Sequence, residues 1–144
     1  MRYLIDTNTF VYLCRDDVDE IDTNIVEIIY NYANTIIISS ESIREIANLL
    51  AVGRIKLAKW KTFDDVKKSV DDFGFEIRYI GEAHLKTLFK LRRAPGHNDP
   101  GDLILIAQAI TEKIPIISSD TDFPFYASQG LDLIQNFRRR KKRR

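Results

Sequence analysis

Residues 97–110 have the sequence HNDPGDLILIAQAI, which joins a loop of turn-forming residues to an apolar run. Residues 103–110 are apolar on nearly every side, a pattern typical of a helix that is buried against a sheet. We therefore expect this segment to be the central helix of the fold, and we expect Asp102 to open it. The next run, 114–117 (IPII), predicts a buried strand that leads into Ser118-Ser119-Asp120.

Short apolar or β-branched runs elsewhere predict further strands, and amphipathic stretches between them predict helices. The predicted strands are 2–5, 35–38, 75–80 and 131–134, and the predicted helices are 21–32, 42–50, 54–73 and 82–93. We expect Ser42 to cap its helix, with Glu45 three residues later. Because strands alternate with helices, the pattern predicts an α/β fold with a mainly parallel central sheet flanked by helices.

The composition suits one compact domain: 144 residues, of which 44% are hydrophobic and 30% are charged. Cys14 is the only cysteine, which excludes an internal disulfide and a thiolate zinc cage and fits a reducing cytoplasm. The longest uncharged stretch, 28–40, contains two asparagines, whereas a membrane helix needs about 20 mostly apolar residues. Asp6 interrupts the N-terminal apolar run before it reaches signal-peptide length. We therefore expect neither membrane insertion nor secretion.

Charge is distributed unevenly along the chain. Residues 138–144 (RRRKKRR) are all basic, whereas residues 1–137 hold 15 Lys and Arg against 21 Asp and Glu, a net charge of −6. We predict a folded domain over 1–137 and a disordered basic tail over 138–144. Such a tail suits contact with phosphates or with an acidic partner, and its alternative is an ordinary solvated terminus.

Four acids lie where α/β proteins place functional groups. Asp6 and Asp120 follow predicted strands, while Glu45 and Asp102 lie in the first turns of predicted helices. The C-terminal ends of parallel strands form the functional crevice of an open α/β sheet, so we expect all four carboxylates on one rim. Two negative charges about 4 Å apart repel by roughly 4 kcal/mol at an effective dielectric of about 20. Four such charges therefore require protons or a cation.

Carboxylate oxygens suit hard cations such as Mg²⁺ or Mn²⁺, which promote in-line displacement at phosphorus. The pattern thus indicates a nuclease-type site in which the four acids are catalytic and metal-binding. Each acid also has a structural interpretation: a turn for Asp6 and Asp120, a capping box with Ser42 for Glu45, and an N-cap or first-turn acid for Asp102. Only the complete set favours the nuclease interpretation.

Four ordered segments of the chain resemble the PIN-domain ribonucleases, specifically the VapC-like toxins of type II toxin-antitoxin pairs. These segments are 3–8 (YLIDTN), 42–55 (SIREIA followed by GRI), 97–109 (HNDPGD leading into ILIAQA) and 116–123 (IISSD, then Phe). The resemblance implies a three-layer PIN-like fold with the four acids at the metal site. The chain departs from it at Gly101 and Leu103, where relatives often have an aromatic residue and an arginine.

The resemblance implies an Mg²⁺- or Mn²⁺-dependent endoribonuclease that cuts single-stranded or loop RNA and leaves a 3′-hydroxyl and a 5′-phosphate. It also implies a cognate antitoxin and a homodimer, for which the stripe of the helix at 21–32 is either a compatible surface or core. We expect His97 to shape its loop. The candidate accessory residues are Asn8, Asp99, Ser118 and Asp122, and the candidate RNA-backbone contacts, or solvated surface charges, are Arg54, Lys56, Lys59 and Lys61.

Two other functions remain open on the sequence alone. A non-catalytic RNA-binding or regulatory module on the same fold would bind RNA without cleavage and without metal, and the complete set of acids argues against it. A phosphoryl-transfer enzyme of the haloacid-dehalogenase type also places an Asp after its first strand. That class expects a second Asp two residues later, where this chain has Asn8.

Overall fold

A computed structural model describes residues 1–137, and the predicted basic tail at 138–144 lies outside the described residues. Five strands form one sheet in the order β3-β2-β1-β4-β5, and every strand pair is parallel. The strands are β1 (Arg2–Ile5), β2 (Thr35–Ser39), β3 (Glu76–Arg78), β4 (Ile116–Ser118) and β5 (Leu133–Gln135). The predicted α/β class is therefore confirmed, and the C-terminal ends of all five strands share one edge.

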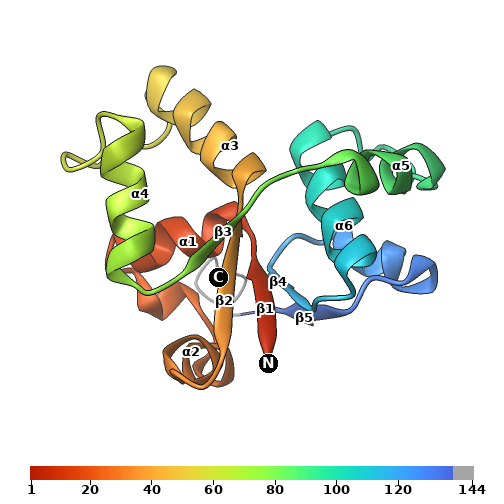
Figure 1. The fold of residues 1–144 in the computed structure, drawn as a ribbon, viewed down its shortest axis with the longest axis horizontal. Coiled ribbons are helices and arrows are strands. Elements are labelled where there is room, and N and C mark those ends of the chain that lie inside the picture. Colours follow the sequence, from red (N-terminus) through yellow and green to blue (C-terminus); the bar gives the residue numbers. More distant parts are fainter. Residues whose placement is uncertain (138–144) are drawn as a thin grey trace.

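Helices cover both faces of this sheet and make a three-layer structure, with α1, α2 and α4 on one side and α5 and α6 on the other (Figure 1). None of the described helices is long and apolar enough to cross a bilayer. The helices are α1 (Thr7–Cys14), α2 (Thr23–Tyr30), α3 (Ser40–Ala51), α4 (Phe63–Asp72), α5 (Glu82–Lys90) and α6 (Pro100–Glu112), with 3-10 helices η1 (Val18–Glu20) and η2 (Phe123–Gln129).

The strands bury side chains on both faces, which explains their uninterrupted apolar runs. In β2, Ile36 and Ile38 pack into the core under α1, α2 and α4, whereas Ile37 packs into the second core under α6. All three isoleucines are at most 2% exposed. A polar residue in either set would be buried without water, so this pattern holds the sheet between its two helical layers.

The helices differ from the prediction in two places. Helix α1 was not predicted, because it has only eight residues and begins Thr-Asn-Thr, which favours turns; it is stabilised instead by burial of Phe10, Val11 and Leu13. Residues 54–62 are a loop rather than the start of a helix. Trp60 is 3% exposed there and donates through Nε1 to Ser69 Oγ (2.9 Å), and a Thr62–Asp65 capping box starts α4.

The start of α3 also differs from the prediction. Ser39 is the N-cap and accepts from the backbone N–H of Glu41 (3.0 Å). Ser42 is buried inside the helix, so the predicted capping box between Ser42 and Glu45 is wrong. The carboxylate of Glu45 is therefore not used for capping. The remaining predicted elements are found with their ends shifted by a few residues.

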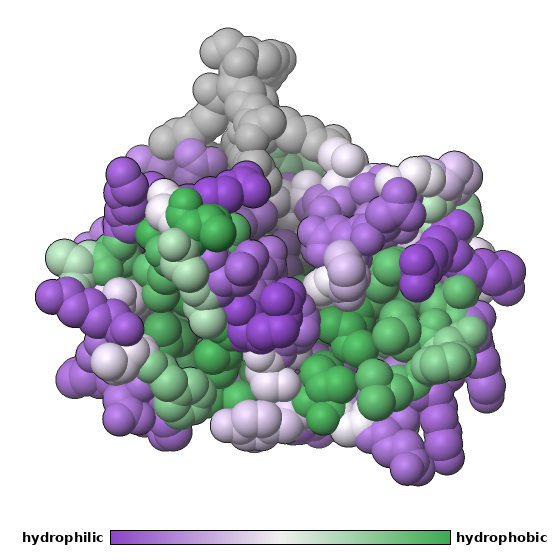
Figure 2. Space-filling view, turned by 90° about the horizontal axis from the view of Figure 1, so that it is seen from above, coloured by the Kyte–Doolittle hydropathy of each residue, from purple (hydrophilic) through white to green (hydrophobic). Residues whose placement is uncertain are grey.

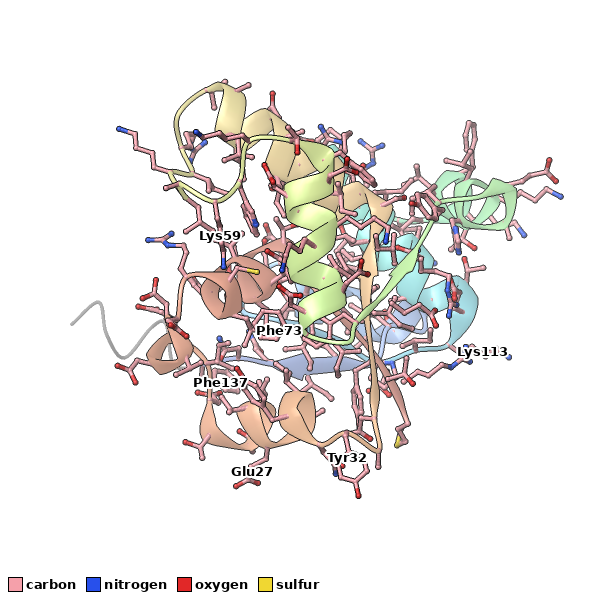
Figure 3. The ribbon with its side chains drawn as sticks, turned by 60° about the vertical axis from the view of Figure 1, so that its left-hand side comes forward. Glu27, Tyr32, Lys59, Phe73, Lys113 and Phe137 are labelled. Carbon is pink, nitrogen blue, oxygen red and sulfur yellow. The ribbon has the colours of Figure 1, made fainter. Side chains whose placement is uncertain are left out.

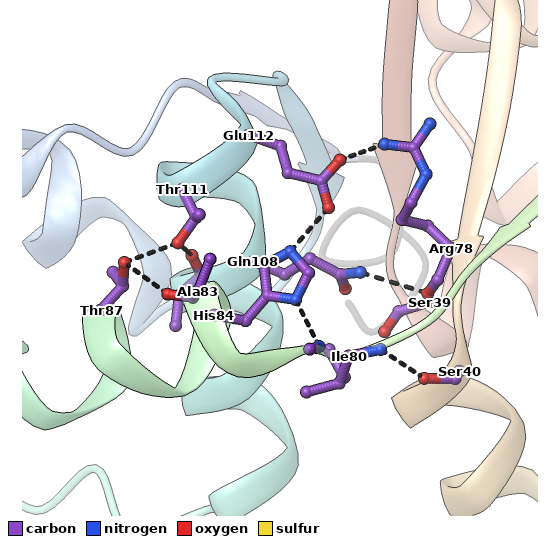
Figure 4. Close-up of polar contacts among 12 residues, drawn as sticks. Ser39, Ser40, Arg78, Ile80, Ala83, His84, Thr87, Gln108, Thr111 and Glu112 are labelled. Atoms are coloured by element: carbon purple, nitrogen blue, oxygen red, sulfur yellow. Dashed lines mark hydrogen bonds and ion pairs between the residues drawn. The ribbon is translucent and has the colours of Figure 1, made fainter.

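A group of polar contacts, the polar clasp, holds α5 against α6 and β3 (Figure 4). His84 is 7% exposed; its Nδ1 accepts from the backbone N–H of Gly81 (2.9 Å), and its Nε2 lies 2.8 Å from Glu112 Oε2. Glu112 also pairs with Arg78 at the end of β3. Because Arg78 is 28% exposed on its side chain, this pair is partly screened by water.

Candidate active site

Asp6 lies at the end of β1, in the middle of the sheet, and caps the N-terminus of α1. Its Oδ1 accepts from the backbone N–H and the hydroxyl of Thr9 (2.9 and 2.7 Å), and its Oδ2 accepts from the hydroxyl of Ser118 (2.7 Å). Burial raises the pKa of the Asp6 carboxyl above its ordinary value, these hydrogen bonds offset the effect only in part, and the charge of Asp120 raises it further. The carboxylate is held rigidly, but its charge is poorly stabilised.

Asp102 lies in the first turn of α6 and does not open the helix as predicted. Asp99 is the N-cap and accepts from the backbone N–H groups of Gly101 (2.9 Å) and Asp102 (3.3 Å). The Asp102 side chain, 21% exposed, is therefore not needed for capping. Burial raises its pKa to about 8, and the charges of Asp120, Asp99 and Glu45 contribute to the rise.

Glu45 and Asp120 complete the set. Burial raises the pKa of the Glu45 carboxyl, a hydrogen bond from Thr7 opposes this, and the charges of Asp99 and Asp6 raise the pKa further. Asp120 Oδ1 accepts from the backbone N–H of Asp122 (2.8 Å). Each of Asp6, Glu45 and Asp102 thus has its pKa raised by another of the four acids. The structure therefore brings the four within electrostatic reach of one another at the C-terminal edge of the sheet.

The predicted accessory residues differ in their connection to this set. Ser118 is fully buried at the end of β4; it donates to Asp6 and accepts from the backbone N–H of Asp120 (3.1 Å). Asp99 acts through its charge on Glu45 and Asp102. Among the described residues, the contact of Asp122 with Asp120 is made by the backbone N–H of Asp122 alone. Asn8 is exposed on α1.

Sequence reasoning missed a buried hydroxyl pair and one basic residue. The hydroxyls of Thr7 on α1 and Ser42 on α3 are hydrogen-bonded to each other (2.9 Å), which joins the helices that follow β1 and β2. Arg44 donates through Nε to both oxygens of Glu41 (3.0 and 2.8 Å); this hydrogen bonding raises the pKa of Arg44, and the charges of Glu41, Glu45 and Asp99 raise it further. The spacing of Glu41 and Arg44, three residues apart on a helix, was the available signal.

Because Gly101 has no side chain, the ends of the Glu41 and Arg44 side chains can lie beside it. A Cβ at position 101 would lie 3.0 Å from Glu41 Oε2 and 3.6 Å from Arg44 Nη2. The aromatic residue that relatives often carry there would displace both side chains. Leu103, the other departure, is 1% exposed, so its side chain belongs to the core.

The predicted RNA-backbone cations are not gathered at the acids. Arg54, Lys56, Lys59 and Lys61 are exposed in the loop that follows α3. Lys59, labelled in Figure 3, has a charge that acts on the thiol of Cys14, the last residue of α1 and so at the far end of this helix from Asp6. An eight-residue helix is about 12 Å long, so Lys59 lies roughly one helix length from Asp6.

The fit of the four acids to a cation rests on their chemistry. Among residues 1–137, no three acidic, histidine or cysteine side chains are arranged to hold an ion as they stand. Mg²⁺ retains several waters and binds through one or two carboxylates, so it does not require a closed protein cage. Burial is the main cause of these raised pKa values, and repulsion between the acids adds to it; a bound cation would relieve that repulsion. Figure 2 shows the molecule from above the view of Figure 1. On this face, hydrophilic residues gather in the middle, between two hydrophobic areas.

Comparison with solved structures identifies the same fold in several toxin-antitoxin complexes. A chain in the structure of VapBC2 from Rickettsia felis bound to a promoter DNA fragment has a TM-score of 0.64 and 22% identity, covering 95% of this chain and 100% of that chain. A chain in DNA-bound VapBC from Salmonella typhimurium has a TM-score of 0.65 and 17% identity, covering 94% and 98%. For VapBC-5 from Mycobacterium tuberculosis, the values are 0.60, 15%, 93% and 98%.

Sequence comparison identifies a family for this chain but no matching curated protein. No curated protein matches the chain significantly. The family profile described as PIN domain matches residues 3–128. Because that match runs from β1 into η2 and so spans most of the chain, the chain belongs to the PIN domain family.

Proposed function

We propose that this protein is a metal-dependent endoribonuclease and the toxin of a toxin-antitoxin pair. The observation that supports the proposal best is the mutual effect of four widely separated acids, each held at the C-terminal edge of the sheet. Uncompensated charge clusters reduce folding stability, and a bound cation would offset that cost. Membership of the PIN domain family supports the proposed nuclease activity.

Asp6, Glu45, Asp102 and Asp120 would hold one or two Mg²⁺ or Mn²⁺ ions, directly or through water. When bound, such an ion lowers the pKa of water and stabilises charge on phosphate oxygens. The protein holds Asp6 in one orientation through Thr9 and Ser118. At neutral pH the metal-free protein retains a proton on Asp102, since its pKa is about 8, and cation binding would release that proton.

The substrate we propose is single-stranded or loop RNA, whose unstacked backbone can enter a crevice at the sheet edge. Hydrolysis by metal-activated water would leave a 3′-hydroxyl and a 5′-phosphate. Arg44 is placed to contact the RNA backbone beside the acids, because its Nε and Nη2 pair with Glu41 and no described residue pairs with Nη1. Arg54, Lys56, Lys59 and Lys61 would contact more distant phosphates.

The partners we propose are an antitoxin and a second copy of the chain, in the cytoplasm. The fold shared with VapBC complexes supports the antitoxin, and a hydrophobic groove of about 500 Å³ between α3 and α4 offers a place for an apolar segment. For the homodimer, Ile25 and Ile29 of α2 lie in the core and offer no surface. Leu85 and Phe89 on α5, 44% and 91% exposed, are better candidates.

The test is an RNA cleavage assay with mapped product ends, run in Mg²⁺, Mn²⁺ or chelator. We expect wild type to cleave only with metal, and Asp6→Asn and Asp102→Asn to lose cleavage. Metal-independent binding of RNA without cleavage would favour the regulatory module instead. Cleavage by both variants at the wild-type rate would contradict the proposed site. Copurification with the product of the adjacent gene tests the antitoxin separately.

A further inference from the structure

The chain has two histidines, and both are buried with both ring nitrogens engaged. His84 belongs to the polar clasp, away from the acids. His97 is 3% exposed and connects the buried hydroxyl of Tyr126 to the carboxylate of Asp102. The two residues therefore have the same kind of surroundings, but only His97 contacts the proposed active site.

A turn in the loop before α6 places the His97 ring. The backbone N–H of His97 donates to the carbonyl of Ala94 (3.0 Å), and Gly96 has φ of +79°. Pro95 and Gly96 are the residues that a type II turn favours at its two central positions. The backbone N–H of Ala94 donates to the Tyr126 oxygen (2.9 Å), so one hydroxyl from η2 contacts both ends of the turn.

These contacts decide which ring nitrogen of His97 carries the proton. The Tyr126 oxygen already accepts from Ala94, and Tyr126 is fully buried, so its own proton needs an acceptor. In the described part of the chain, the acceptor within reach is His97 Nδ1, at 2.8 Å. The proton of the neutral ring then lies on Nε2, 3.2 Å from Asp102 Oδ2, where it can donate to the carboxylate.

We propose that His97 is a positioning residue for the metal site: Tyr126 fixes its tautomer, and its Nε2–H holds the Asp102 carboxylate in one orientation. The proposal rests on the proposed function, because it assigns Asp102 to a cation. Partners of this kind set the orientation of ligating side chains, and their removal typically weakens metal affinity by about 10- to 100-fold. His97 therefore does more than shape its loop.

The first test measures Mn²⁺ affinity of the full chain by calorimetry. We expect His97→Leu to bind Mn²⁺ about tenfold or more weakly than wild type. His97→Gln keeps a donor near the position of Nε2, so its affinity should lie closer to wild type than to His97→Leu. The matched controls are His84→Leu and His84→Gln, which should lower the melting temperature and leave Mn²⁺ affinity unchanged.

The second test needs no metal. Nitrogen-15 NMR of the metal-free protein at neutral pH should show Nδ1 unprotonated and Nε2 protonated in His97. His84 is an internal reference, because the backbone N–H of Gly81 can only donate to its Nδ1. Tyr126→Phe should alter the His97 signals and leave those of His84 in place. A His97 ring protonated on Nδ1 in wild type would overturn the proposal.

The two levels of failure are distinguishable. If wild type binds no Mn²⁺ and cleaves no RNA, the proposed function is wrong, and the positioning role is wrong with it. If wild type binds Mn²⁺ and His97→Leu binds it equally well, only the positioning role is overturned. An equal loss in His97→Leu and His97→Gln would also overturn it, because the donor would then not be what matters.

Discussion

Replacing Asp102 by Asn should make the metal-free protein more stable while it abolishes cleavage. The pKa of Asp102 in the folded protein is about 8, above the ordinary value of 3.8 that the unfolded chain retains. The folded state therefore binds the proton more tightly, and ionising this carboxyl costs folding free energy. Asn has nearly the same shape and no charge, so the variant avoids that cost.

The sign and size of the effect follow from these two pKa values. Between about pH 4 and pH 8 the folded state holds more protons than the unfolded state, so wild-type stability falls as pH rises through this window. Each pKa unit corresponds to about 1.4 kcal/mol. Because the side chain is 21% exposed and water screens its charge, we expect a gain of only about 1 to 2 kcal/mol for Asp102→Asn at pH 8.

The assay is urea unfolding with chelator present, repeated from pH 5 to pH 9. The gain for Asp102→Asn should shrink towards the acidic end, where wild-type Asp102 is protonated. A suitable control is Asp71→Asn, since Asp71 is 58% exposed in a surface ion pair with Lys67, and its effect should stay within about 0.5 kcal/mol. If Asp102→Asn were less stable than wild type at every pH, the reasoning about crowded acids would be refuted.

Three further changes test other parts of the account. Ser118→Ala leaves Asp6 Oδ2 and the backbone N–H of Asp120 without their partner, so urea unfolding should show a loss of about 1 to 3 kcal/mol; no loss would contradict this role. Gly101→Phe places a ring where the ends of the Glu41 and Arg44 side chains lie, so it should cost about 1 to 3 kcal/mol in the same assay. An unchanged unfolding midpoint would argue against this close contact. Arg44→Gln should weaken binding of a single-stranded RNA oligomer and reduce its salt slope by about 1, more than Arg54→Gln does; equal effects would remove Arg44 from the site.

The sheet and the positions of two acids followed from local sequence. Runs such as TIII at 35–38 are long enough and apolar enough to require burial on both faces, and Asp6 and Asp120 come directly after strands. In a parallel sheet, these positions share one edge whatever the loops do. The pattern therefore predicted both the fold class and the convergence of the acids.

The rest depends on contacts between distant parts of the chain. Helix α1 has weak local propensity and forms because its apolar residues enter the core. The periodicity of 54–73 could not separate the loop from α4, since Trp60 is buried from within an irregular segment. Tyr126 lies 29 residues after His97, and the sequence contains no local signal that joins them.

The central claim is that Asp6, Glu45, Asp102 and Asp120 together hold a divalent cation. Crystals soaked in Mn²⁺ test it most directly, because the ion is located by its anomalous scattering. The account predicts a peak among these four carboxylates, at direct or water-mediated coordination distance, and its loss in Asp6→Asn. A fully occupied ion elsewhere with none among the four acids, or no bound ion at all, would contradict it.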